Sequence, residues 1–232
     1  MRRPFLALAF AASGGSLLAL DARAQDAATA AVAGQETVAG YDSLRVLVNR
    51  GLQGNRHDDY DLALAFVDQL LAAAPDDAIA LHYRGFVLYR KASILVASKG
   101  DRTLTRSLFE EAGRALERSD ATLRWPETRA LRSAVVGQLI GFSGVLGPMR
   151  LGPRAARLLD EAVALGPDNP RVWMLRGVSA MFKPRLFGGG TGKAERDLLR
   201  ALELFARDVP QSPAAPWWGH AETYGWLGQV YV

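Results

Sequence analysis

The sequence contains no cysteine among its 232 residues. Disulfide bonds are therefore excluded, and so is a structural zinc site built on thiolate ligands. A lipoprotein anchor is excluded as well, because lipid attachment after a signal sequence requires a cysteine.

Long hydrophobic runs are scarce, and the one at the N-terminus has the pattern of a secretory signal. Arg2 and Arg3 precede an apolar run that ends at Leu20, and a small-x-small cleavage pattern follows at residues 22–24. Glycines and serines inside the run argue against a membrane anchor. Residues 2–6 also resemble the core of a twin-arginine signal, so the route of export stays open.

We therefore expect cleavage after Ala24 and export of the remaining chain. No other apolar run in the sequence reaches membrane-spanning length. The expected compartment is the periplasm of a bacterium with two membranes, or the outside of the cell. Residues 25–40 are small and polar, which predicts a flexible leader.

The part of the chain that we expect to be exported has almost no excess of basic over acidic residues. Without residues 1–24 the chain has 25 basic and 23 acidic residues, which lowers the formal net charge from +4 to +2. Acidic and basic residues are interspersed, whereas a nucleic-acid-binding protein usually shows a basic stripe. No nucleic-acid partner is expected.

The sequence also lacks the alternation of apolar and polar residues that is typical of β-strands, and it shows helical spacing instead. Apolar residues recur at helical spacing within residues 62–74 and 155–165, and a proline follows each segment. Residues 75–85 and 167–177 share Pro, Asp, Arg and Gly at the same offsets, 92 positions apart. The sequence therefore predicts an all-α fold built from repeated helical hairpins.

These segments resemble tetratricopeptide repeats, whose first helix has the pattern W-x2-L-G-x2-Y and whose second has A-x3-F-x2-A before a proline. The aromatic and glycine positions of the first helix match Trp173 and Gly177. Residues 224–231 match the first-helix pattern almost in full, while residues 155–162 and 194–201 match the second helix with leucine in place of phenylalanine. A similar Phe-Gly-Gly-Gly turn also occurs in exported bacterial repeat proteins of unassigned role.

The resemblance covers residues 41–232 and implies a short right-handed solenoid of four helix pairs followed by a terminal helix. Small residues at the matched positions would let the two helices of a pair approach closely. The first-helix glycines and the second-helix residues expected to face them are Gly51 and Ala63, Gly85 and about Leu108, Gly137 and Ala155, and Gly177 and Ala194.

The stretch Pro184–Leu204 combines three glycines with Gly192-Lys193, which suggests a phosphate-binding loop. That motif needs glycine at its first position and serine or threonine after the lysine, and the chain has Phe187 and Ala194 there. The preceding segment is helical in pattern, although the motif follows a strand. The simpler prediction is an enlarged turn between the two helices of a repeat.

Other chemical motifs are weak. His57 lies beside Asp58, Asp59 and Asp61, a set that would suit a metal ion or simply form a polar turn. No Ser-His-Asp order, carboxylate pair or His-Glu-x-x-His pattern is visible. We expect no catalytic residues, no cofactor and no metal.

A tryptophan cluster at residues 213–226 admits two interpretations. Aromatic clusters bind carbohydrate, peptide or proline-rich partners. Alternatively, the proline-rich linker folds over the preceding hairpin and a tryptophan seals the core, which is the interpretation we favour.

The resemblance also implies a concave face lined by five positions of each first helix. On a soluble protein such an apolar surface marks a contact site, unless a short array closes up and buries it as core. Both alternatives stay open. The candidate partner-binding residues are Ile79, His82, Phe86, Tyr89, Arg90, Phe142, Arg171, Met174, Val178, Met181 and Phe182.

The sequence thus predicts an exported, non-catalytic helical-repeat scaffold that binds a protein or peptide through its concave face. The alternative is a periplasmic solute-binding protein that works with a transporter, since repeat proteins of that kind have a related architecture.

Overall fold

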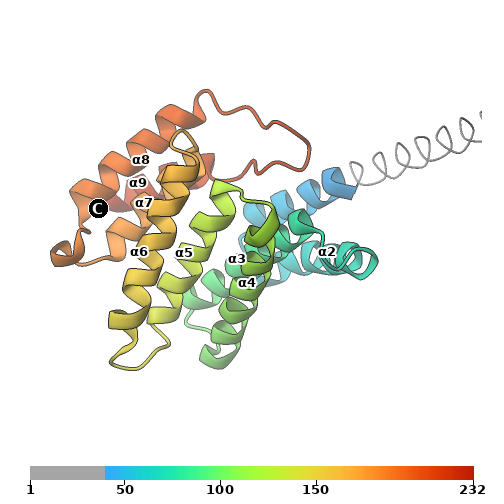
Figure 1. Cartoon of the computed structure of the whole chain (residues 1–232), viewed down its shortest axis with the longest axis horizontal. Helices are drawn as coiled ribbons and strands as arrows, with labels where there is room; N and C mark the ends of the chain where they lie inside the picture. Colours follow the sequence, from blue (N-terminus) through green and yellow to red (C-terminus); the bar gives the residue numbers. More distant parts are fainter. Residues whose placement is uncertain (1–39) are drawn as a thin grey trace, which may run out of the picture. The chain divides into compact units, whose positions relative to one another are not determined.

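The computed structural model describes residues 40–232, so the predicted signal peptide and nearly all of the leader lie outside the described residues. Every regular element in the described part is a helix, which confirms the all-α prediction (Figure 1). Tyr41–Val232 form one compact unit.

The helices follow one another with short connections, except before the last one. Residues 40–54 are helical, and two 3-10 turns, η1 (His57–Tyr60) and η2 (Arg185–Phe187), accompany the longer elements. The remaining helices are α2 (Asp61–Ala73), α3 (Ala78–Ala97), α4 (Arg102–Thr122), α5 (Pro126–Ile140), α6 (Gly147–Leu165), α7 (Pro170–Phe182), α8 (Thr191–Phe205) and α9 (His220–Val230).

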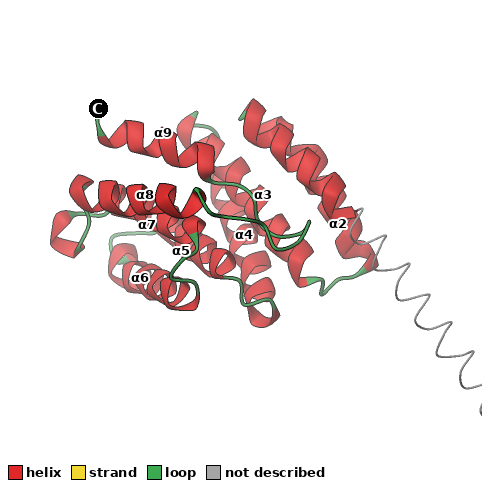
Figure 2. Ribbon diagram, turned by 90° about the horizontal axis from the view of Figure 1, so that it is seen from above, coloured by secondary structure: helices red, strands yellow, loops and turns green. Residues whose placement is uncertain are grey.

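Consecutive helices form antiparallel pairs, and the pairs stack (Figure 2). The most extensive packing is between the two helices of the second pair (α3 and α4), of the third pair (α5 and α6) and of the fourth pair (α7 and α8). Between pairs, α5 packs against both α4 and α7, and α9 packs against α8. The described residues are therefore organised as paired helices followed by a last helix, α9.

The first helix of each pair begins at a residue that the local sequence explains. The Asp77 carboxylate accepts hydrogen bonds from the Ile79 and Ala80 amides at 2.9 and 3.1 Å, and so caps α3. Asn169 caps α7 in the same way. Both α5 and α7 have proline at the first helical position, where a missing amide hydrogen costs nothing.

A small residue stands eight positions after the N-cap of α3, α5 and α7. A Cβ on Gly85 would lie 2.4 Å from Leu116 Cγ, and one on Gly177 would lie 2.7 Å from Leu198 Cγ. Ser133 has the same position in α5, and its hydroxyl donates to the Ala155 carbonyl at 2.7 Å. Close approach of the two helices in each pair depends on these residues.

The register predicted for two of the pairs was wrong. A Cβ on Gly137 would meet no atom within 4 Å, so Gly137 does not face α6, and Ser133 one turn earlier does. In the second pair Gly85 faces the carbonyl of Ala112 rather than Leu108. The fourth pair has the predicted register, with Gly177 against Ala194.

The glycine cluster is a turn between α7 and α8, as predicted. Gly188 and Gly190 have φ angles of 79° and 115°, which glycine adopts without strain. A Cβ on Gly189 would lie 1.8 Å from the Lys183 carbonyl oxygen, and the Gly190 amide donates to the Ala180 carbonyl at 2.8 Å. The turn geometry therefore accounts for all three glycines.

Candidate functional site: a covered concave face

The first helices α3 and α7 carry most of the predicted groove residues, and a long connection packs against both of them. This connection, residues 206–219, joins α8 to α9 without regular secondary structure and is the long orange-red loop of Figure 1. We call it the covering segment. Its contacts decide which predicted groove residues are accessible.

The predicted groove residues divide into three groups by exposure. The buried ones are His82, Phe86, Arg171 and Met174. The partly buried ones are Ile79, Tyr89, Arg90, Phe142, Val178 and Met181. Phe182 alone among them is exposed.

Trp218 closes the centre of the concave face. Its ring stacks on Phe86, with centroids 4.8 Å apart and an angle of 22° between the planes. The Arg171 guanidinium lies over the Trp218 ring, 6.0 Å from its centroid. A Cβ on the neighbouring Gly219 would lie 3.3 Å from Met174 Sδ, so the chain lies close against α7.

Trp217 ties the covering segment to the beginning of the array. Its ring stacks on Tyr83 at 5.4 Å, and its indole nitrogen donates to Asn49 Oδ1 at 2.6 Å. The Arg45 guanidinium lies 5.1 Å from the ring centroid. The Tyr83 hydroxyl donates to the Ala214 carbonyl at 2.8 Å. The linker thus folds over the helices and the centre of the face is filled, but its tryptophans stack on α3 and reach Asn49 rather than covering only the preceding hairpin.

His82 lies fully buried beneath this cover, with an exposed fraction of 0%. Its Nδ1 hydrogen-bonds with the Thr128 hydroxyl at 2.8 Å, whereas its Nε2 has no hydrogen-bond partner. The rings of Tyr83 and Trp125 meet the imidazole edge to face at 5.0 and 5.2 Å. Burial, and secondarily the charge of Arg171, lowers the pKa of His82 to about 3, so its imidazole is neutral.

Arg171 is a buried cation on α7 with two acidic neighbours. Its guanidinium donates to Asp208 at 2.7 Å and lies 3.9 Å from Glu127. The Glu127 carboxylate in turn accepts a hydrogen bond of 2.7 Å from the side-chain amide of Asn169. The Nε of Arg171 and the indole nitrogen of Trp218 are buried without a hydrogen-bond partner. Buried polar atoms are normally paired, so three such nitrogens, counting His82 Nε2, mark an unusual site.

Sequence reasoning missed Glu127. The signal was present, because Pro126 and Pro170 both open a first helix and place Glu127 and Arg171 at the same position. The repeat pattern hid this match, because it predicts Gly137, rather than Ser133, as the residue of α5 that faces α6.

Phe142 does not belong to the concave face in the corrected register. It follows the end of α5 and packs against Phe109 of α4, with centroids 6.0 Å apart. The Arg102 guanidinium lies 4.6 Å from the Phe142 centroid. Phe142 was assigned to the face because the register was shifted by one helical turn.

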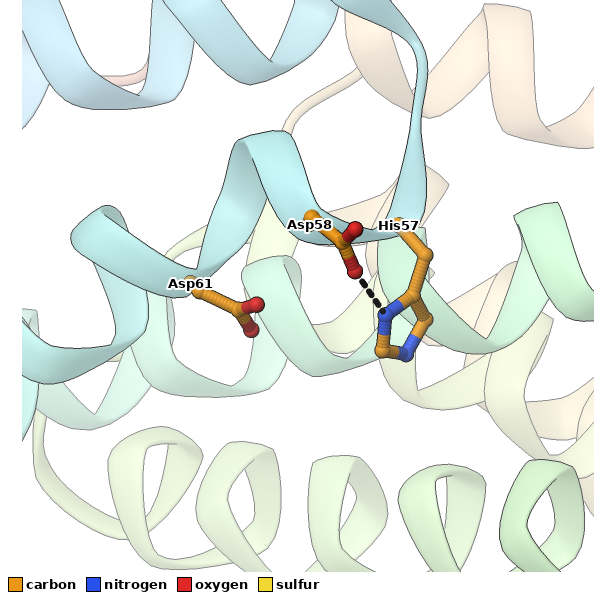
Figure 3. Close-up of side chains that lie close together, drawn as sticks. All are labelled: His57, Asp58 and Asp61. Atoms are coloured by element: carbon orange, nitrogen blue, oxygen red, sulfur yellow. Dashed lines mark hydrogen bonds and ion pairs between the residues drawn. The ribbon is translucent and has the colours of Figure 1, made fainter.

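The histidine–aspartate cluster forms an ordered turn at the start of α2 (Figure 3). Ligand atoms of His57, Asp58 and Asp61 lie within 4.8 Å of one another, and His57 Nδ1 is 3.3 Å from Asp58. The buried Lys91 ammonium already pairs with Asp61 and donates to the His57 carbonyl at 3.3 Å. This cation neutralises part of the charge that a metal ion would need.

No known family model matches the chain, and no curated protein matches it either. Among solved structures the chain is similar to the HusA haemophore from Porphyromonas gingivalis, with a TM-score of 0.64 and 21% sequence identity. The likeness covers 80% of this chain and 91% of that one. At this identity it shows a shared fold. None of the described helices is long and apolar enough to cross a bilayer.

Proposed function

We propose that the protein is an exported, non-catalytic binding protein whose ligand site is the concave face beneath the covering segment. The proposed ligand is a planar, largely apolar anion of the haem type. This develops the solute-binding alternative drawn from the sequence.

The observation that carries the proposal is the buried, neutral His82 with its unpartnered Nε2. A neutral imidazole nitrogen is a common protein ligand of haem iron. The partner of the other ring nitrogen selects the tautomer, and Thr128 takes that role here when it accepts from Nδ1. The free Nε2 is then available as an electron-pair donor.

The surroundings of His82 suit the rest of such a ligand. Phe86 and Trp218 supply aromatic faces for a flat apolar ring system. Arg171 supplies a cation for a ligand carboxylate, which would take the place of Asp208. Likeness to a haemophore, a protein named for carrying haem, supports the same ligand class.

The covering segment has to move for a ligand to reach this site. It has no regular secondary structure, and its stretch from Val209 to Pro213 is exposed. It is held on the helices by the rings of Trp217 and Trp218, by the hydrogen bond from Tyr83 to Ala214 and by the ion pair of Asp208 with Arg171. Displacement of Trp218 from Phe86 would uncover the centre of the face, so that binding exchanges an internal aromatic contact for a ligand contact.

A titration with haemin, followed by visible absorption, tests the proposal. We expect saturable binding with a shifted Soret band, and we expect His82→Ala to abolish the shift. His220→Ala is the matched control, because His220 is exposed and lies at the start of α9. Equal spectra for wild type and His82→Ala would contradict the role given to His82, and absence of binding would contradict the proposal.

The covering segment itself favours a second candidate, the protein or peptide partner predicted from the sequence. A segment without helix or strand that contains Pro213, Pro216 and two tryptophans already occupies the face, as a proline-rich peptide partner would. A synthetic peptide of residues 208–219 should then bind a Trp218→Ala variant more tightly than it binds the wild type. Peptide binding without haemin binding would select this candidate.

A further inference from the structure

Two turns of the array expose large apolar side chains. Val145, Leu146 and Met149 lie at the turn between α5 and α6, and the Val145 side chain is 96% exposed. Leu186 and Phe187, at 88% and 66% exposure, lie in η2 between α7 and α8. Side chains of this size are normally buried, and exposed clusters of them mark contact sites.

Both turns emerge at the same edge of the helical unit. Each connects the two helices of a pair, and α5 packs against α7. Figure 1 shows the two turns at the lower-left and left of the unit. We call residues 141–150 and 182–190 together the loop edge.

The charges at the loop edge have one sign. Residues 141–157 and 182–193 contain no aspartate or glutamate. Among the described residues, Arg150, Lys183 and Arg185 form no ion pair with any carboxylate. Arg102 adds a further cation by donating to the Gly141 carbonyl. Elsewhere in the unit most arginines do pair with acidic groups, as Arg129 and Arg132 do.

The corresponding turn of the second pair has no apolar residue between its helices, and the exposed apolar residues that flank it, Val96 and Leu104, are each 45% exposed. Residues 98–101, between α3 and α4, read Ser-Lys-Gly-Asp, and the final aspartate caps α4. A turn between paired helices therefore needs no exposed apolar side chain to form. The apolar residues at the loop edge are an addition to what the fold requires.

We propose that the loop edge docks on the surface of an anionic lipid bilayer. Apolar side chains at the tips of turns can enter the boundary between headgroups and acyl chains, while neighbouring cations meet anionic headgroups. A protein partner of matching charge would have to supply a concave apolar surface lined with acids. A bilayer offers both properties without a specific shape, and it accommodates two separate turns. This proposal is independent of the ligand proposed for the concave face.

Co-sedimentation with lipid vesicles tests it. The wild type should bind vesicles of phosphatidylcholine mixed with phosphatidylglycerol, and it should bind pure phosphatidylcholine about tenfold less. The double variant Leu186→Asp/Phe187→Asp should lose about tenfold in binding to the anionic vesicles. Arg150→Glu/Arg185→Glu should lose a similar amount and should remove most of the salt dependence.

Leu62→Asp is the matched control, since Leu62 is an exposed leucine on α2, outside the loop edge. Helical circular dichroism and the unfolding midpoint of each variant should equal those of the wild type. Equal binding to both vesicle types would overturn the proposal, and so would equal loss in the control. Loss of haemin binding in the loop-edge variants with unchanged vesicle binding would also overturn it, and would move the ligand site to this edge.

Discussion

The concave face and the loop edge are both apolar, but only the concave face is covered by the protein's own chain. Trp218 stacks on Phe86 at the face, whereas Phe187 at the edge is 66% exposed. At the face, aromatic packing encloses His82 and Arg171 and leaves buried nitrogens without partners. At the edge, glycines fix the turn and nothing in the unit covers the side chains. The contrast shows that the connection between α8 and α9 covers the face and leaves the edge open.

The largest expected difference between the two regions is in stability. Phe86→Ala should lower the free energy of unfolding by about 3–5 kcal/mol, because it leaves a cavity between α3 and Trp218. Phe187→Ala should change it by less than about 0.5 kcal/mol, because the ring is exposed. Urea denaturation followed by circular dichroism measures both values, and similar losses would remove the distinction between a covered and an uncovered region.

A second pair of variants tests the helix packing that supports the concave face. Gly177→Ala should cost about 1–3 kcal/mol, since its Cβ would lie 2.7 Å from Leu198 Cγ and 3.1 Å from the Ala194 carbonyl oxygen. Gly137→Ala should instead stabilise the protein by about 0.5–1 kcal/mol, because its Cβ meets no neighbour and alanine favours helix. Thermal unfolding distinguishes the two, and a stabilising Gly177→Ala would disprove the register.

The smallest expected effect is a pH dependence that belongs to the covered face. The pKa of His82 is lowered to about 3 in the folded protein, so below its ordinary pKa the unfolded state binds a proton that the folded state does not. The free energy of unfolding should therefore have its full value above the ordinary pKa of histidine and should fall as the solution is acidified below it. The expected loss between about pH 7 and pH 5.5 is about 1 kcal/mol.

Two histidine variants test whether His82 causes this pH dependence. His82→Gln should show a flatter pH profile than the wild type, because it removes the buried imidazole. His220→Gln, which removes an exposed histidine, is measured as the comparison. Urea midpoints measured across that pH range provide the comparison. Parallel profiles for wild type and His82→Gln would show that other groups cause the loss.

Local signals were enough to predict the helices. Pro75 and Pro167 directly follow α2 and α6, within two residues of the last helical position. Gly177 gave the correct register of the fourth pair because its neighbours repeat those of Gly85. Gly137 gave a false one, since a glycine on an exposed helix face looks the same in sequence as one in a helix contact. Ser133, which fills the position, carries no distinctive pattern.

The centre of the candidate site was predicted in part. His82, Phe86, Arg171 and Met174 were named from the repeat pattern, and all four are buried. Their burial could not be derived, because it depends on contacts between residues far apart in the chain. Nothing local to Trp218 specifies that its ring meets Phe86. The sequence left an open and a filled face as equal alternatives, and long-range packing decides between them.

The covering segment also changes how the array should unfold. In a simple stack of helix pairs each pair touches only its neighbours, so the ends can open one after another. Here hydrogen bonds join Tyr83 to Ala214 and Asn49 to Trp217, which are 131 and 168 positions apart. Closing loops of that length slows folding, because their entropy is lost before the contacts form. Residues 40–54 and α3 are thereby tied to the covering segment, so the start of the array should open together with that segment rather than by itself.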